Sequence, residues 1–162
     1  MIYLIIILTF GISFLSISQI DPNDIEIVRD SFGVPHIYAK TDAQVAYGLA
    51  WAHAEDDFET IQYAYLAGNG LLGHYLGKDG IGADFLASFI GSEELYKKKF
   101  NTDISPEYIK VLEGYSAGLN SYAKHNPDEV LSSKLFPVTP KKMMKYGQLQ
   151  LFMSSRGDYW VS

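Results

Sequence analysis

The stretch IEIVRDSFGVPHIYA, residues 25–39, decides the N-terminal fold of this chain. β-Branched residues dominate residues 25–29, turn-forming residues occupy Asp30 to Gly33, and an apolar extended run resumes from Val34 to Ala39. This order predicts a β-hairpin. Pro35 has no backbone N–H to donate, so the second strand should lie at a sheet edge or turn that position away from its partner.

A long helix should follow the hairpin. Thr41 and Gln44 have the spacing of a capping box, and apolar residues then recur at helical spacing from about Asp42 to Leu66. The apolar face is rich in alanine and has Gly48 nearby, and small side chains let a neighbouring element approach closely. The pattern therefore predicts one long helix that packs tightly against another element.

Two further helices and a loop are predicted downstream. Ser105, with proline and glutamate directly after it, begins a helix that runs to about Lys124, and another runs from about Pro140 to Ser155. The glycine-rich residues 68–82 predict a loop with one short helical turn near 71–76. The pattern indicates an α+β fold with only two strands of its own. Because a two-stranded sheet is marginal by itself, further strands should come from elsewhere.

The composition bounds the class of protein. With 162 residues and 48% hydrophobic content the chain can build one domain with a sizeable core, which excludes a disordered protein. Its 13 basic and 19 acidic residues give a formal charge of -6, and its longest basic run is Lys97 to Lys99, so nucleic acid is not expected as a partner. Cysteine is absent, so stability must come from packing and hydrogen bonds. The aromatic content of 14% fits a packed core or a buried interface with another chain.

The N-terminus has the features of an export signal. Residues 1–18 carry no charged side chain, and the apolar stretch from Ile2 to Leu15 precedes a small-x-small pattern that ends at Ser18. We predict a signal peptide over residues 1–18, a mature chain over residues 19–162, and a periplasmic or secreted location. The alternative is a membrane anchor formed by residues 2–20, since this run approaches the ~20 apolar residues that a spanning helix needs.

Few residues suggest a complete catalytic or metal site. His53, Asp56 and Asp57 lie at i, i+3 and i+4 and share a helix face, which permits a metal site, but a solvated acidic face explains them better. No role is assigned to His36 or His74. The triplet from Arg156 to Asp158 matches an adhesion motif, but a match of three residues arises easily by chance. The sequence lacks a nucleophile elbow, a phosphate loop and a dinucleotide fingerprint. We therefore predict no catalytic residue and no metal ligand in this chain.

Several sequence blocks resemble the penicillin acylase family of N-terminal-nucleophile hydrolases. The segments Ile27–Asp30 and Gly33–Ala39 are similar to the opening of the family. Further blocks follow in the family's order and extend the resemblance over about Asp24 to Ser155: Tyr47-Gly48, Ala52-His53-Ala54-Glu55-Asp56, Gly70, Leu76-Gly77-Lys78-Asp79, and Leu112-Glu113-Gly114-Tyr115-Ser116-Ala117-Gly118-Leu119-Asn120.

The resemblance implies the α-chain portion of an αββα sandwich, made from a precursor that cuts itself in two. A serine at the new N-terminus of the β-chain would attack the amide carbonyl with its own α-amino group as base, and oxyanion donors would also come from the β-chain. The substrates implied are linear N-acyl amides such as penicillins or acyl-homoserine lactones. Without the β-chain this chain should be inactive. The acyl-pocket side chains of the family come from the helix that begins near Pro140, but their positions here are not assigned.

Other expectations concern a calcium ion, positions where this sequence departs from the family's usual residues, and an alternative function. Some members have a calcium-binding carboxylate that would fall at about Val161 or beyond Ser162, so calcium is expected only in a full-length enzyme. The family usually has Gln-Asp-Arg at Glu55–Asp57, a tryptophan at Val138 and an aspartate at Lys142. The alternative function is a stand-alone secreted or membrane-tethered helical binding domain without catalysis. A polar, capped C-terminus would favour it, whereas this sequence ends in an aromatic stretch that contains Tyr159 and Trp160.

Overall fold

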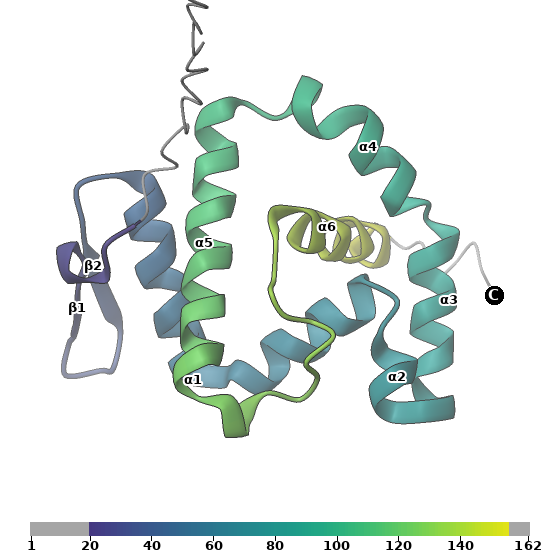
Figure 1. Ribbon diagram of the computed structural model, residues 1–162, viewed down its shortest axis with the longest axis horizontal. Coiled ribbons are helices and arrows are strands. Elements are labelled where there is room, and N and C mark those ends of the chain that lie inside the picture. Colours follow the sequence, from purple (N-terminus) through teal and green to yellow (C-terminus); the bar gives the residue numbers. More distant parts are fainter. Residues whose placement is uncertain (1–19, 156–162) are drawn as a thin grey trace, which may run out of the picture.

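The computed structural model describes residues 20–155 and shows a hairpin followed by helices arranged in a ring (Figure 1). The predicted signal peptide, residues 1–18, and the triplet that begins at Arg156 lie outside the described residues. The elements are β1 (Glu26–Arg29), β2 (Pro35–Tyr38), α1 (Asp42–Gly68), α2 (Leu72–Leu76), α3 (Ile81–Phe89), α4 (Ser92–Asp103), α5 (Pro106–His125) and α6 (Pro140–Ser154), with 3-10 turns at Pro22–Asp24, Gly77–Gly80 and Pro127–Glu129.

The predicted hairpin is confirmed. Strands β1 and β2 pair antiparallel, and Arg29 lies opposite Pro35 next to the turn. Asp30 closes the turn because its carboxylate accepts the backbone N–H groups of Phe32 at 2.8 Å and Val34 at 3.0 Å. Gly33 has a φ of 82°, which a residue with a Cβ adopts only with strain. The α+β class follows from this one two-stranded sheet and the helices around it.

Helix α1 begins where predicted but is not continuous. The capping box of Thr41 and Gln44 is present. At Asp57 the backbone leaves the helical region, and its carboxylate accepts the N–H of Thr60 at 3.0 Å. The predicted long helix has the expected extent, but it is interrupted at Asp57, whose side chain caps a new helical start. Figure 1 shows the two halves of α1 at a large angle to one another.

Glycines allow the backbones of α1 and α5 to touch. A Cβ at Gly114 would collide with the carbonyl oxygen of Ala43, and one at Gly118 would collide with that of Tyr47. The hairpin packs on α1 in the same way, since a Cβ at Gly48 would meet Ile37 and Ile25 at 2.8 and 2.9 Å. The tight approach that the small residues predict is therefore confirmed.

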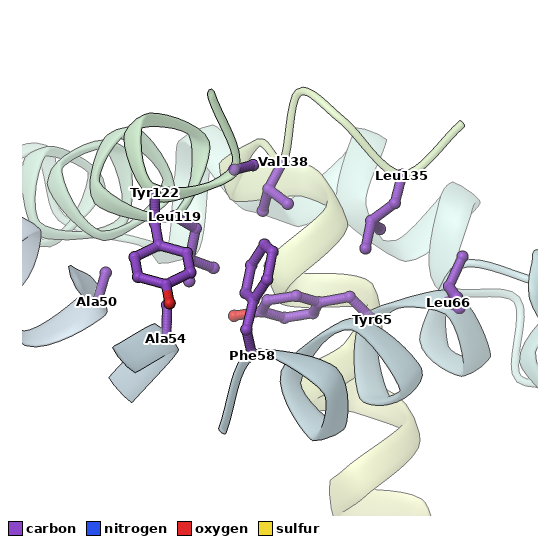
Figure 2. Packing of buried hydrophobic residues seen from close by; sticks show 10 residues of the cluster. Ala50, Ala54, Phe58, Tyr65, Leu66, Leu119, Tyr122, Leu135 and Val138 are labelled. Carbon is purple, nitrogen blue, oxygen red and sulfur yellow. The ribbon is translucent and has the colours of Figure 1, made fainter. Parts of the chain in front are cut away.

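The segment predicted as a loop holds more helix than expected. The short turn near 71–76 is present as α2, but α3 begins at Ile81 inside the glycine-rich stretch, and α4 follows directly. The main core lies instead where α1, α5 and the segment before α6 meet (Figure 2). Leu66, Leu119 and Leu135 are fully buried there. In the part of the chain that the structure describes, no helix combines the length and apolar character of a membrane span.

Candidate functional site

Helix α6 is the candidate site, because the resemblance assigns acyl-pocket side chains to the helix that begins at Pro140. Thr139 caps it by accepting the N–H of Lys142 at 3.3 Å. Only Leu149 of this helix is buried, while Leu151 and Met153 near its end are 70% and 46% exposed. Two large apolar side chains thus face solvent in the last turns of the helix.

The segment that leads into α6 is held by two amide side chains. Asn120 of α5 bonds both backbone groups of Val138, accepting its N–H at 2.7 Å and donating to its carbonyl at 2.8 Å. Gln62 of α1, which is 1% exposed, accepts the N–H of Leu131 at 2.8 Å and donates to the carbonyl of Glu129 at 2.9 Å. Each amide replaces a backbone partner that an irregular segment lacks, so the path of the chain into α6 is fixed.

Lys142 completes this anchoring. Its ammonium group donates to the carbonyl oxygens of Lys134 at 3.3 Å and Pro137 at 3.0 Å, and also to that of Leu135. Burial lowers the pKa of Lys142, and the nearby Lys145 lowers it further. On the other side of the backbone, the carbonyl of Lys142 accepts a hydrogen bond from Asn69 of α1 at 3.0 Å. The departure from the family's aspartate therefore has a structural role here, since only a cation can donate to three carbonyls at once.

Ion pairs also link α6 to α4. Glu93, in the first turn of α4, pairs with Lys141 and, at 3.6 Å, with Lys145. Lys97 of its own helix adds a pair at 3.4 Å. The hydrogen bond from Lys141 lowers the pKa of Glu93. The start of α6 is therefore held both by the carbonyl contacts of Lys142 and by the carboxylate of Glu93.

The residues of the alternative metal site do not act together. His53, Asp56 and Asp57 each have a different partner. These are the hydroxyl of Tyr115 for His53 at 3.0 Å, Arg29 of the hairpin for Asp56 at 2.8 Å, and the N–H of Thr60 for Asp57 at 3.0 Å. Within residues 20–155 no three His, Asp or Glu side chains are grouped to hold a metal ion. The position expected for calcium, about Val161, lies outside the described residues.

Two histidines without assigned roles have partners that sequence reasoning missed. His36 lies 3.3 Å from the carboxylate of Asp30 across the hairpin turn, and the pKa of Asp30 is lowered chiefly by the Phe32 N–H and then by His36. His74 shares a hydrogen bond with Lys134 at 3.1 Å, over 60 positions of sequence. The contact of Asp30 with His36 could have been predicted, because a hairpin turn brings residues at this spacing together. No feature of the neighbouring sequence indicates the contact of His74 with Lys134.

A groove of about 270 Å³ lies between the hairpin and the helices. Its walls are mostly apolar and include Ile25, Ile27 and Trp51, and Ser121 and His125 of α5 also line it. The His125 ring donates through Nδ1 to the backbone carbonyl of Ser121 at 2.8 Å, not to its hydroxyl. This pair is therefore not arranged as an activated serine nucleophile.

Comparison with known proteins gives a consistent result. The family model described as penicillin amidase matches residues 24–158. Penicillin G acylase of Escherichia coli is 26% identical over 156 residues, which cover 88% of this chain and 17% of that protein. The acyl-homoserine lactone acylase PvdQ of Pseudomonas savastanoi pv. phaseolicola is 29% identical over 103 residues, covering 59% of this chain and 13% of that one. This chain thus spans about a sixth of the length of these relatives, or less.

A solved structure shows the same fold. The thermostable penicillin G acylase from Alcaligenes faecalis superposes with a TM-score of 0.67 at 20% sequence identity. The match covers 81% of this chain and 74% of that chain. The arrangement of hairpin and helices is therefore one that is already known from an experimental structure.

Proposed function

The chain belongs to the penicillin amidase family, and from this premise we propose that it is the N-terminal part of an exported acylase that hydrolyses linear N-acyl amides. The observation that carries the proposal is the family match over residues 24–158, which includes the whole of α6 and the groups that anchor it. The related acylases are named for penicillin G and for acyl-homoserine lactones, so we take these two amide classes as the candidate substrates.

Our proposal divides the work between two polypeptides. The β-chain would supply the attacking serine, whose own α-amino group serves as base because an α-amine titrates near neutral pH. This chain would supply α6 as one wall of the acyl pocket. The exposed Leu151 and Met153 suit that role, since an acyl pocket is an apolar surface with few polar groups. Calcium would belong to the full-length enzyme only.

The geometry supports a partner for the sheet as well. The hairpin buries one face on α1, where Ile25 and Ile37 pack around Gly48, and leaves Val28 and Tyr38 45% and 60% exposed on the other. Glu26 and His36 share this outer face, and a two-stranded sheet is only marginally stable in water by itself. Strands from a β-chain would cover this face and complete the sandwich.

The direct test supplies the missing part. The 162-residue chain is expressed alone and together with the E. coli penicillin G acylase polypeptide that follows the matched stretch, and release of the acyl group is measured with penicillin G and an N-acyl-homoserine lactone. We expect no hydrolysis by the chain alone and hydrolysis of at least one probe by the pair. The E. coli polypeptide expressed alone is the control. Turnover by the 162-residue chain without a partner would contradict the proposal, because it would place the nucleophile inside this chain.

A further inference from the structure

Helix α3 leaves three large apolar side chains exposed to solvent. Its one charged side chain, Asp84, turns inward and accepts the backbone N–H groups of Leu72 at 2.8 Å and Gly73 at 2.9 Å. Leu86 is half-buried and Ala87 is buried, but three large apolar side chains are exposed: Ile81, Phe85 and Phe89 at 58%, 64% and 66%. We call these three residues, spaced four apart along one side of the helix, the outer stripe of α3.

The outer stripe differs from the solvated surfaces nearby. Helix α4 covers its outer surface with ion pairs at i,i+4 spacing, Lys97 with Glu93 and Lys99 with Asp103. The outer stripe has no charge, and the rings of Phe85 and Phe89 stack with their centroids 6.3 Å apart. Single exposed apolar residues are ordinary, but a contiguous uncharged stripe of this kind marks a surface that meets another molecule.

We propose that the outer stripe of α3 is part of the surface that binds the remaining, larger polypeptide of the acylase. This rests on the proposed function, and it adds a third contact surface to the hairpin and α6. Because the chain matches only 17% and 13% of its relatives' lengths, most of an acylase lies outside it and offers ample area to cover the stripe.

Other occupants fit the stripe less well. A stable dimer buries about 800 Å² on each partner, which three side chains of a nine-residue helix do not provide. A lipid surface prefers helices that carry Lys or Arg on their polar face, and α3 has neither. The chain's charge of -6 also opposes binding to anionic lipids.

The test uses the full 162-residue chain, co-expressed with the tagged E. coli penicillin G acylase polypeptide that follows the matched stretch. The variant is the double substitution Phe85→Ser/Phe89→Ser. The matched control, Leu95→Ser/Tyr108→Ser, removes two apolar side chains of 44% and 51% exposure from α4 and α5. The amount of chain retained per tagged polypeptide is measured, and far-UV circular dichroism checks that each variant keeps its helix content.

We expect the double variant to be retained at least about tenfold less than the wild-type chain, because buried aromatic anchors dominate interface energies. The control should be retained within about twofold of wild type. Equal retention of all three chains would overturn the role of α3 while leaving the proposed function in place. No retention of the wild-type chain would overturn both. Two results would instead overturn the proposal by identifying a different binding partner for the stripe. One is self-association of the wild-type chain in sedimentation experiments, and the other is binding to phosphatidylcholine vesicles, if either is lost in the double variant.

Discussion

Replacing Lys142 with methionine tests whether one ammonium group holds the segment that precedes α6. Methionine keeps most of the aliphatic stem and removes the donor to the carbonyls of Lys134, Leu135 and Pro137. A hydrogen bond to a charged group contributes about 1.5–3 kcal/mol. Only the bond to Leu135 is partly buried, since the other two carbonyls are exposed enough to bond water instead.

The net effect should be smaller than the gross value of that bond. Burial of the ammonium group, which lowers the pKa of Lys142, offsets part of the gain. We therefore expect the variant to make local opening of residues 130–139 easier by about 1–2 kcal/mol, which corresponds to about 5- to 30-fold faster amide exchange. Peptides from the middle of α5 should not change.

Hydrogen–deuterium exchange followed by mass spectrometry measures this in the 162-residue chain bound to the E. coli penicillin G acylase polypeptide used above. The N–H groups of Leu131 and Val138, bonded to Gln62 and Asn120, report on the segment. The control Lys110→Met removes an exposed lysine from α5 and should leave the segment's exchange within about twofold of wild type. Exchange in Lys142→Met within twofold of wild type, or a wild-type segment without protection, would refute the anchoring role.

Three further outcomes are expected. Gly114→Ala should abolish soluble folded chain, because the added Cβ collides with the carbonyl of Ala43. Gly147→Ala, whose Cβ meets nothing within 4 Å, should stabilise α6 by about 0.5–1 kcal/mol. Resistance to protease digestion compares the two variants, and equal resistance would contradict the close approach of α1 and α5. Lys141 holds the pKa of Glu93 below its usual 4.5, so the α4–α6 ion pair is present above that pH and lost as pH falls through the lowered value. Helix content should therefore fall on acidification more steeply in wild type than in Glu93→Gln, and parallel curves would argue against the pair. The chain alone should show weak near-ultraviolet dichroism and bind anilinonaphthalene sulfonate, because its partner-binding surfaces are exposed; a sharp, cooperative thermal transition of a soluble monomer would favour the non-catalytic binding domain instead.

Local chemistry made much of the fold predictable. The hairpin turn, the capping box at Thr41 and the starts at Ser105 and Thr139 depend on residues within a few positions of one another, and all four are present. The break at Asp57 was missed because the apolar spacing continues through it to Phe58 and Ile61, so periodicity conceals the cap. Helix α3 was missed because it begins inside the glycine-rich stretch, whose residues favour turns, although Ile81, Phe85 and Phe89 recur at helical spacing.

The anchoring of α6 was beyond sequence reasoning for a different reason. Gln62, Asn120 and Lys142 bond backbone groups that lie 67–69, 18 and 5–8 residues away, and no periodic pattern marks such partners. The family blocks include Asn120 but give it no role without the contact to Val138.

These polar contacts help to hold α6, which we propose as a wall of the acyl pocket. Hydrogen bonds are directional, so the two bonds of Asn120 to Val138 fix both the position and the orientation of the backbone just before Thr139. Helix α6 also packs on α1, since Gly68 lies against the backbone of Tyr146 and the ring centroids of Tyr65 and Tyr146 lie 5.3 Å apart, but Leu149 is its only buried side chain. Polar groups at the start of α6 and Glu93 along its side help to orient the helix, and Leu151 and Met153 near its end stay exposed. These two side chains could then contact a substrate or a second polypeptide, as the proposed wall of a shared acyl pocket requires.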